Sequence, residues 1–156
     1  MSDFTDHFGF DMATSVPESA RAFNAGAQSF VAWRADTMGH LDTAIAADPN
    51  FILPQILKAW ILHGGRTTKY DPAIDRLVAD IAPSNNLSPR ERALLDGLLA
   101  ARLGNFQAGA ATLEAHLATY PLDLLAHRLL QFELFWCGES HWMRDVAKRA
   151  APAWND

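Results

Sequence analysis

Four of the eight prolines recur at a nearly constant spacing in this chain of 156 residues. The intervals between Pro49, Pro83, Pro121 and Pro152 are 34, 38 and 31 residues, and each proline follows a stretch rich in alanine and leucine. A proline has no backbone N–H and clashes with the preceding turn, so it stops a helix that runs into it. A helix stop at this interval predicts a repeating unit with room for two helices and a turn.

Helix-forming residues dominate the chain, and no alternation typical of a strand lasts more than a few residues. Two helices in about 34 residues is the period of the tetratricopeptide repeat (TPR). We therefore expect an all-α, TPR-like α-α superhelix over residues 17–156, after a lead-in segment at residues 1–16. The alternative is a non-repeating helical bundle in which the prolines fall at this spacing by chance. The four expected antiparallel helix pairs are 17–31 with 36–47, 52–63 with 71–81, 88–103 with 107–119, and 122–137 with 140–150.

Two helices that cross closely need small residues at the crossing. In the TPR pattern the first helix carries such a residue twenty-four positions before the proline, where Ala25, Ala59 and Gly97 fit and Arg128 does not. The second helix carries one twelve positions before the proline, and Gly109 fits there best. The third pair is therefore the most regular repeat.

The third pair also has the clearest signals for helix ends. Ser88, followed three residues later by Glu91, predicts a capping box, and Pro89 suits the first turn of a helix. Gly104 and Asn105 predict a tight turn to the next helix, because glycine adopts positive φ without strain.

Segments along nearly the whole chain carry a family resemblance. They are Gly9–Ser15, Ala46–Phe51, Arg90–Arg92, Gly104–Phe106, Tyr120–Ala126 and Met143–Trp154. These segments resemble the N-terminal part of the tetratricopeptide repeat protein 38 family. The resemblance implies an α-α superhelix with an interaction role and no established catalytic residues. Members of that family are longer and continue with further helical repeats, so it also implies that this chain is a fragment of a longer repeat protein or a short member.

Composition disfavours several classes of protein. Thirteen Lys and Arg against eighteen Asp and Glu give a net charge of −5, which disfavours nucleic-acid binding. The single cysteine, Cys137, excludes an internal disulfide and a cysteine-based zinc site. The acidic N-terminus does not resemble a signal peptide, and no apolar run reaches the roughly 18 residues of a membrane span. We expect a cytoplasmic protein that binds no cofactor, metal or membrane.

No motif indicates catalysis. Ser140 lies between Glu139 and His141 but lacks the Gly-x-Ser-x-Gly elbow of a nucleophile, and the only glycine-rich basic loop lacks the phosphate-binding pattern. We interpret histidines such as His127 as ordinary surface or cap residues. The sequence therefore predicts a protein that is not an enzyme.

The first helices of the expected pairs carry an apolar stripe. In a TPR superhelix these helices line the concave groove, and a long exposed apolar stripe needs a cover. We expect the groove to bind a helix or peptide of a partner protein; a second copy of the chain or further repeats are the other covers. The residues of this predicted groove are Ile56, Trp60, His63, Leu94, Leu98, Leu129 and Phe132.

A second hypothesis uses the same groove as a pocket for a substrate or another small molecule. His63, Glu91 and Arg128 would then supply the polar groups of the pocket. This hypothesis belongs to a different class of function, an enzyme or a small-molecule-binding protein.

Overall fold

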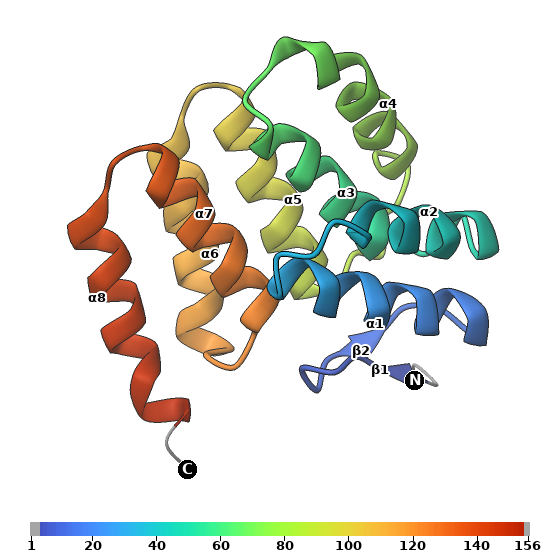
Figure 1. Cartoon of the computed structure of the whole chain (residues 1–156), viewed down its shortest axis with the longest axis horizontal. Coiled ribbons are helices and arrows are strands. Elements are labelled where there is room, and N and C mark those ends of the chain that lie inside the picture. The colour runs from blue at the N-terminus through green and yellow to red at the C-terminus, as the bar shows by residue number, and fades with distance from the viewer. Residues whose placement is uncertain (1–3, 155–156) are drawn as a thin grey trace. The chain divides into compact units, whose positions relative to one another are not determined.

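A computed structural model describes residues 4–154 of the protein, and these residues form an all-α fold (Figure 1). The chain divides into two compact units, one ending at Asn85 and the other beginning at Asn86. The boundary falls in the loop between the second and third of the expected helix pairs.

The first unit contains four α-helices, and each packs against the next one along the chain. A 3-10 helix, η1, precedes the last of them. These elements are α1 (Pro17–Val31), α2 (Thr37–Ala47), α3 (Ile52–Gly64), η1 (Thr68–Tyr70) and α4 (Asp71–Ile81).

A short hairpin lies within the segment expected as a lead-in. Strands β1 (Phe4–Thr5) and β2 (Asp11–Met12) pair antiparallel. The Oδ1 atom of Asp6 accepts the backbone N–H groups of Phe8 and Phe10, both at 2.9 Å, and so holds the turn. The sequence did not predict these strands, because two residues are too few to show an alternating pattern. Residues 1–3 of the expected lead-in lie outside the described residues.

The second unit also contains four α-helices that pack in chain order, and its second helix contacts its fourth as well. A 3-10 helix, η2, follows the last of them. These elements are α5 (Pro89–Arg102), α6 (Phe106–Thr119), α7 (Leu124–Trp136), α8 (Ser140–Ala150) and η2 (Ala151–Trp154).

The helix bounds agree with those expected from the sequence. Each of the α-helices in the described part of the chain begins and ends within two residues of its expected bound. Helix stops such as proline and glycine are local signals, so they can be read without knowing the tertiary structure.

The predicted signals at the ends of α5 are confirmed. Ser88 Oγ accepts the backbone N–H of Glu91 at 3.2 Å, and Glu91 Oε2 accepts the backbone N–H of Ser88 at 2.8 Å, which completes the capping box. Gly104 has a φ of 79° in the turn that follows. Asn105 then caps α6 by accepting the backbone N–H of Ala108 at 3.2 Å. Local hydrogen bonds therefore define both sides of this turn.

Helices α5 and α6 approach closely at Gly97 and Gly109, two positions where the TPR pattern predicts small residues. A Cβ atom added to Gly109 would lie only 2.7 Å from the carbonyl oxygen of Gly97. In α1 and α2 the corresponding contact is made by Gly26, where an added Cβ would lie 3.1 Å from Leu41. The expected position, Ala25, is displaced from this contact by one residue.

We predict that Gly109→Ala lowers the free energy of unfolding by about 1–3 kcal/mol, because the new methyl group forces the two helix backbones apart. Urea unfolding followed by circular dichroism measures the change. Gly39→Ala is the matched control, because a Cβ there meets nothing within 4 Å. This control should stabilise the chain by roughly 0.5–1 kcal/mol through helix propensity. Equal changes for the two variants would contradict the close approach.

Candidate functional site

Most residues of the predicted groove belong to the core. Ile56, Trp60, Leu94, Leu98 and Leu129 each expose at most 3% of their surface. The prediction that these five residues line an open groove is therefore wrong. Their spacing correctly identifies the apolar face of each helix, but that face is buried rather than open. Such burial contributes about 25 cal/mol for each Å² of apolar surface.

The other two groove residues, His63 and Phe132, are half-buried. His63 Nε2 lies 3.2 Å from Arg66 Nη1, and its ring meets the ring of Trp60 edge-on. The ring of Phe132 packs edge-on against Trp136, with 6.0 Å between the ring centroids. Phe132 therefore packs against an aromatic residue at the end of α7.

The residues of the small-molecule hypothesis lie on α3, α5 and α7. Glu91 is buried. Its carboxylate accepts two hydrogen bonds from Ser88, one from the backbone N–H and one from the hydroxyl group. Because its carboxylate is buried in the capping box, Glu91 does not supply a polar group to the hypothesised pocket.

A buried ion cluster holds the start of α7. Asp123 is 0% exposed and caps α7 by accepting the backbone N–H of Ala126 at 3.1 Å. Its two carboxylate oxygens accept from Nε and Nη2 of Arg90, both at 2.8 Å. His116 Nε2 lies 2.9 Å from one of these oxygens. The cluster joins the first turn of α5 and the last turn of α6 to the start of α7.

The cluster keeps Asp123 ionised although it is buried. Burial raises the pKa of this carboxyl, but the hydrogen bond from His116 and the charge and N–H groups of Arg90 together lower the pKa below its ordinary value of 3.8. The three side chains bond to one another and all are buried, so none of them is open to a substrate. We therefore assign the cluster a structural role.

We predict that Asp123→Asn lowers the free energy of unfolding by about 3–5 kcal/mol, because the buried Arg90 loses its counter-charge. The amide oxygen can still cap α7, so the loss reports on the ion pair. Asn105→Ala is the control, because it removes an exposed cap that has no ion pair and should cost about 1 kcal/mol. Urea unfolding compares the two. A loss for Asp123→Asn no greater than that of the control would contradict the cluster's role.

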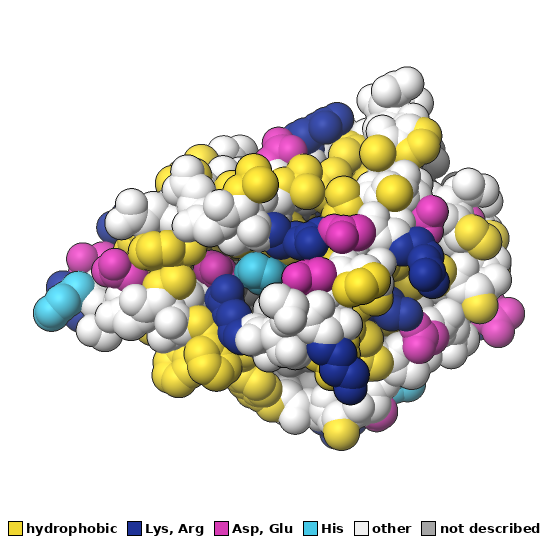
Figure 2. Space-filling view, turned by 90° about the horizontal axis from the view of Figure 1, so that it is seen from above, with side chains coloured by type: hydrophobic (Ala, Val, Ile, Leu, Met, Phe, Trp, Pro, Cys, Tyr) yellow, Lys and Arg dark blue, Asp and Glu magenta, His cyan; other side chains and the backbone are white. Residues whose placement is uncertain are grey.

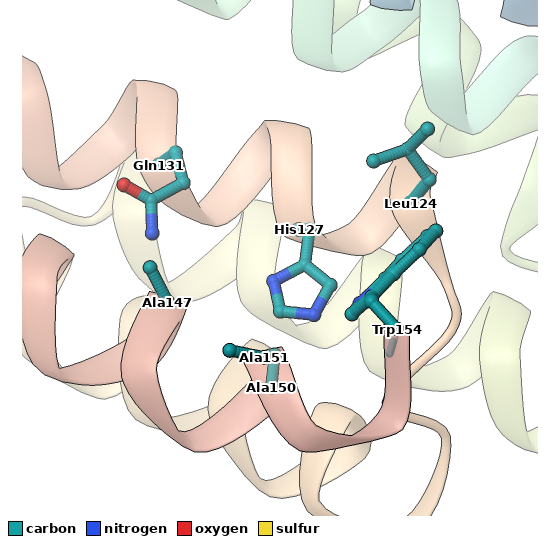
Figure 3. Close-up of a pocket in the computed structure, with 7 residues that line it drawn as sticks. All are labelled: Leu124, His127, Gln131, Ala147, Ala150, Ala151 and Trp154. Carbon is teal, nitrogen blue, oxygen red and sulfur yellow. The ribbon is translucent and has the colours of Figure 1, made fainter. Parts of the chain in front are cut away.

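A pocket of about 290 Å³ lies between α7 and the helices that follow it. Figure 3 shows that α7 forms one wall and that α8 and η2 form the other. The residues that line the pocket are Leu124, His127, Gln131, Ala147, Ala150, Ala151 and Trp154.

His127 supplies the pocket with a hydrogen-bond acceptor. His127 is 9% exposed, and its ring points from α7 into the space between the helices (Figure 3). Its Nε2 lies 3.1 Å from the carbonyl oxygen of Pro121, which can only accept, so Nε2 carries a proton. Burial lowers the pKa of His127 below 6.5, and the weaker opposing effects of Pro121 and Asp123 do not restore it. The ring is therefore neutral at neutral pH, and its Nδ1 is an acceptor.

Two side chains close the ends of the pocket. Gln131 Nε2 donates to the carbonyl oxygen of Met143 at 3.0 Å and ties α7 to the first turn of α8. The indole of Trp154 meets the ring of His127 edge-on, with 6.5 Å between the ring centroids. Between these ends α8 and η2 contribute only alanines, and their short side chains leave the space open.

The sequence pattern does not predict this pocket. The interpretation of His127 as a surface or cap residue is corrected, because the structure buries this side chain. The helical spacing of the lining residues is a sequence signal for the two walls of the pocket. Residues 124, 127 and 131 share one face of α7, and residues 147, 150, 151 and 154 follow the spacing of one helix face. Spacing alone does not show that these two faces meet.

An exposed aromatic pair lies at the end of α7. Phe135 and Trp136 are 62% and 52% exposed, and their rings meet edge-on with 5.6 Å between the centroids. We call Phe132, Phe135 and Trp136 the aromatic surface. Large aromatic side chains at such exposure leave apolar area in contact with water, and they are enriched where proteins bind one another.

Charge is mixed on the molecular surface shown in Figure 2. On that face Lys and Arg side chains lie beside Asp and Glu, and hydrophobic side chains form several groups among them. In residues 4–154 no group of three His, Cys, Asp or Glu side chains could hold a metal ion. Within the same residues, no helix has the length and apolar character needed to cross a membrane.

No family model matches this chain, and a search of the solved structures gives no significant match.

Proposed function

We propose that this chain is a TPR-like helical-repeat protein, related to the tetratricopeptide repeat protein 38 family, that binds a protein partner and is not an enzyme. The positions of the helix ends support the repeat. Helices α2, α4, α6 and α8 each end two residues before one of the regularly spaced prolines. A non-repeating bundle gives no reason for this regularity.

The partner-binding surface in this proposal is the aromatic surface on α7. The single observation that carries it is the exposure of Phe135 and Trp136 side by side. A partner that covers these two rings removes apolar area from water, which favours association. Phe132 is half-buried and its ring packs edge-on against Trp136, so the Trp136 side chain loses less conformational freedom when a partner binds.

We predict that a photo-reactive phenylalanine analogue at position 135 forms a discrete cross-linked product in cells, because the partner covers this position. The same analogue at Leu103 is the control, because that side chain is 87% exposed and lies outside the aromatic surface. Denaturing gel electrophoresis and mass spectrometry identify the product. A product of twice the chain's mass would identify a second copy of the chain as the partner.

The cross-linking also distinguishes specific binding from collision. Trp136→Ser should abolish the product at position 135 while the unfolding curve stays close to that of the parent chain, because the tryptophan is half-exposed. Identical products at positions 135 and 103, or a product that persists in Trp136→Ser, would contradict the proposed surface.

A further inference from the structure

The pocket between α7 and α8 has a chemistry that the partner-binding proposal does not use. We infer that it binds a small planar aromatic molecule of about the size of indole that carries one N–H or O–H donor. This inference goes beyond the proposed function and does not depend on it, because none of the residues of the aromatic surface lines the pocket.

The size and walls of the pocket select a small apolar ligand. Its volume of about 290 Å³ lies at the lower end of the range for small-molecule pockets, roughly 300–1,000 Å³. The alanines at 147 and 151 are exposed, so an occupant would remove apolar surface that water now covers. Leu124 and the half-exposed indole of Trp154 provide an apolar and aromatic end against which a flat ring can pack.

The acceptor in the pocket determines what the ligand must carry. His127 is more than nine-tenths buried and its ring is aimed into the pocket (Figure 3). Its Nε2–H is occupied by Pro121, whereas its Nδ1 has no hydrogen-bond partner in the described part of the chain. A purely apolar occupant would displace water from Nδ1 without offering a hydrogen-bond donor in its place, which is unfavourable for a polar atom that becomes buried. An occupant with one donor replaces that water.

Indole is the probe that tests this inference, and 1-benzofuran is its matched control. Benzofuran has the same fused rings but an oxygen atom in place of the N–H group, so it fills the pocket without donating. Each compound is titrated into the full chain, and the backbone amide signals of Ala147, Ala150 and Ala151 are followed by two-dimensional NMR. We expect saturable shifts with indole and at least about tenfold weaker binding of benzofuran.

Two variants test where the probe binds. Ala147→Leu fills the pocket from an exposed position and should weaken indole binding at least about tenfold. Ala111→Leu is its control, because this exposed alanine of α6 does not line the pocket, and indole affinity should be unchanged. His127→Phe keeps a flat ring but removes the acceptor, so indole and benzofuran should then bind equally. If this variant does not fold, the two alanine variants decide the matter.

Three results would overturn the inference. One is the absence of saturable shifts at these alanines up to millimolar indole. Another is equal affinity of the parent chain for indole and benzofuran, which would show a pocket without a requirement for a donor. The last is unchanged indole affinity in Ala147→Leu, which would place the binding elsewhere.

Discussion

The carboxylate of Asp123 is the interaction on which the second unit depends most. It is buried and ionised, and it accepts hydrogen bonds from α5 through Arg90, from α6 through His116 and from the first turn of α7 through Ala126. Burial raises the pKa of this carboxyl, and the three partners together lower the pKa below 3.8, so the group stays ionised. A carboxylate held in this way fixes the point at which α7 begins relative to both preceding helices.

The position of α7 in turn sets both candidate sites. The start and middle of this helix carry Leu124, His127 and Gln131, which form one wall of the pocket against α8. Its end carries the exposed rings of Phe135 and Trp136. The two sites lie at different stretches of one helix, so a partner on the aromatic surface and a small molecule in the pocket would both depend on the same anchored element.

The helices of this fold could be predicted from sequence because their ends are marked locally. The capping box of Ser88 and Glu91, and the close approach at Gly97 and Gly109, follow from residue type and spacing. The candidate sites could not be predicted in the same way. Helical spacing places Leu98 on the apolar face of its helix but does not show that this face is buried. The cluster at Asp123 joins residues 33 positions apart, a pairing that no local pattern specifies.

The protonation of His127 tests the account of the pocket most directly. A long-range ¹H–¹⁵N correlation spectrum of the full chain, recorded between about pH 5 and pH 8, distinguishes the two neutral forms of the ring from its charged form. The structure predicts a neutral ring at pH 7 with the proton on Nε2, and a titration midpoint below 6.5, because burial disfavours the charged form. A charged ring at pH 7, or a proton on Nδ1, would contradict an acceptor aimed into the pocket.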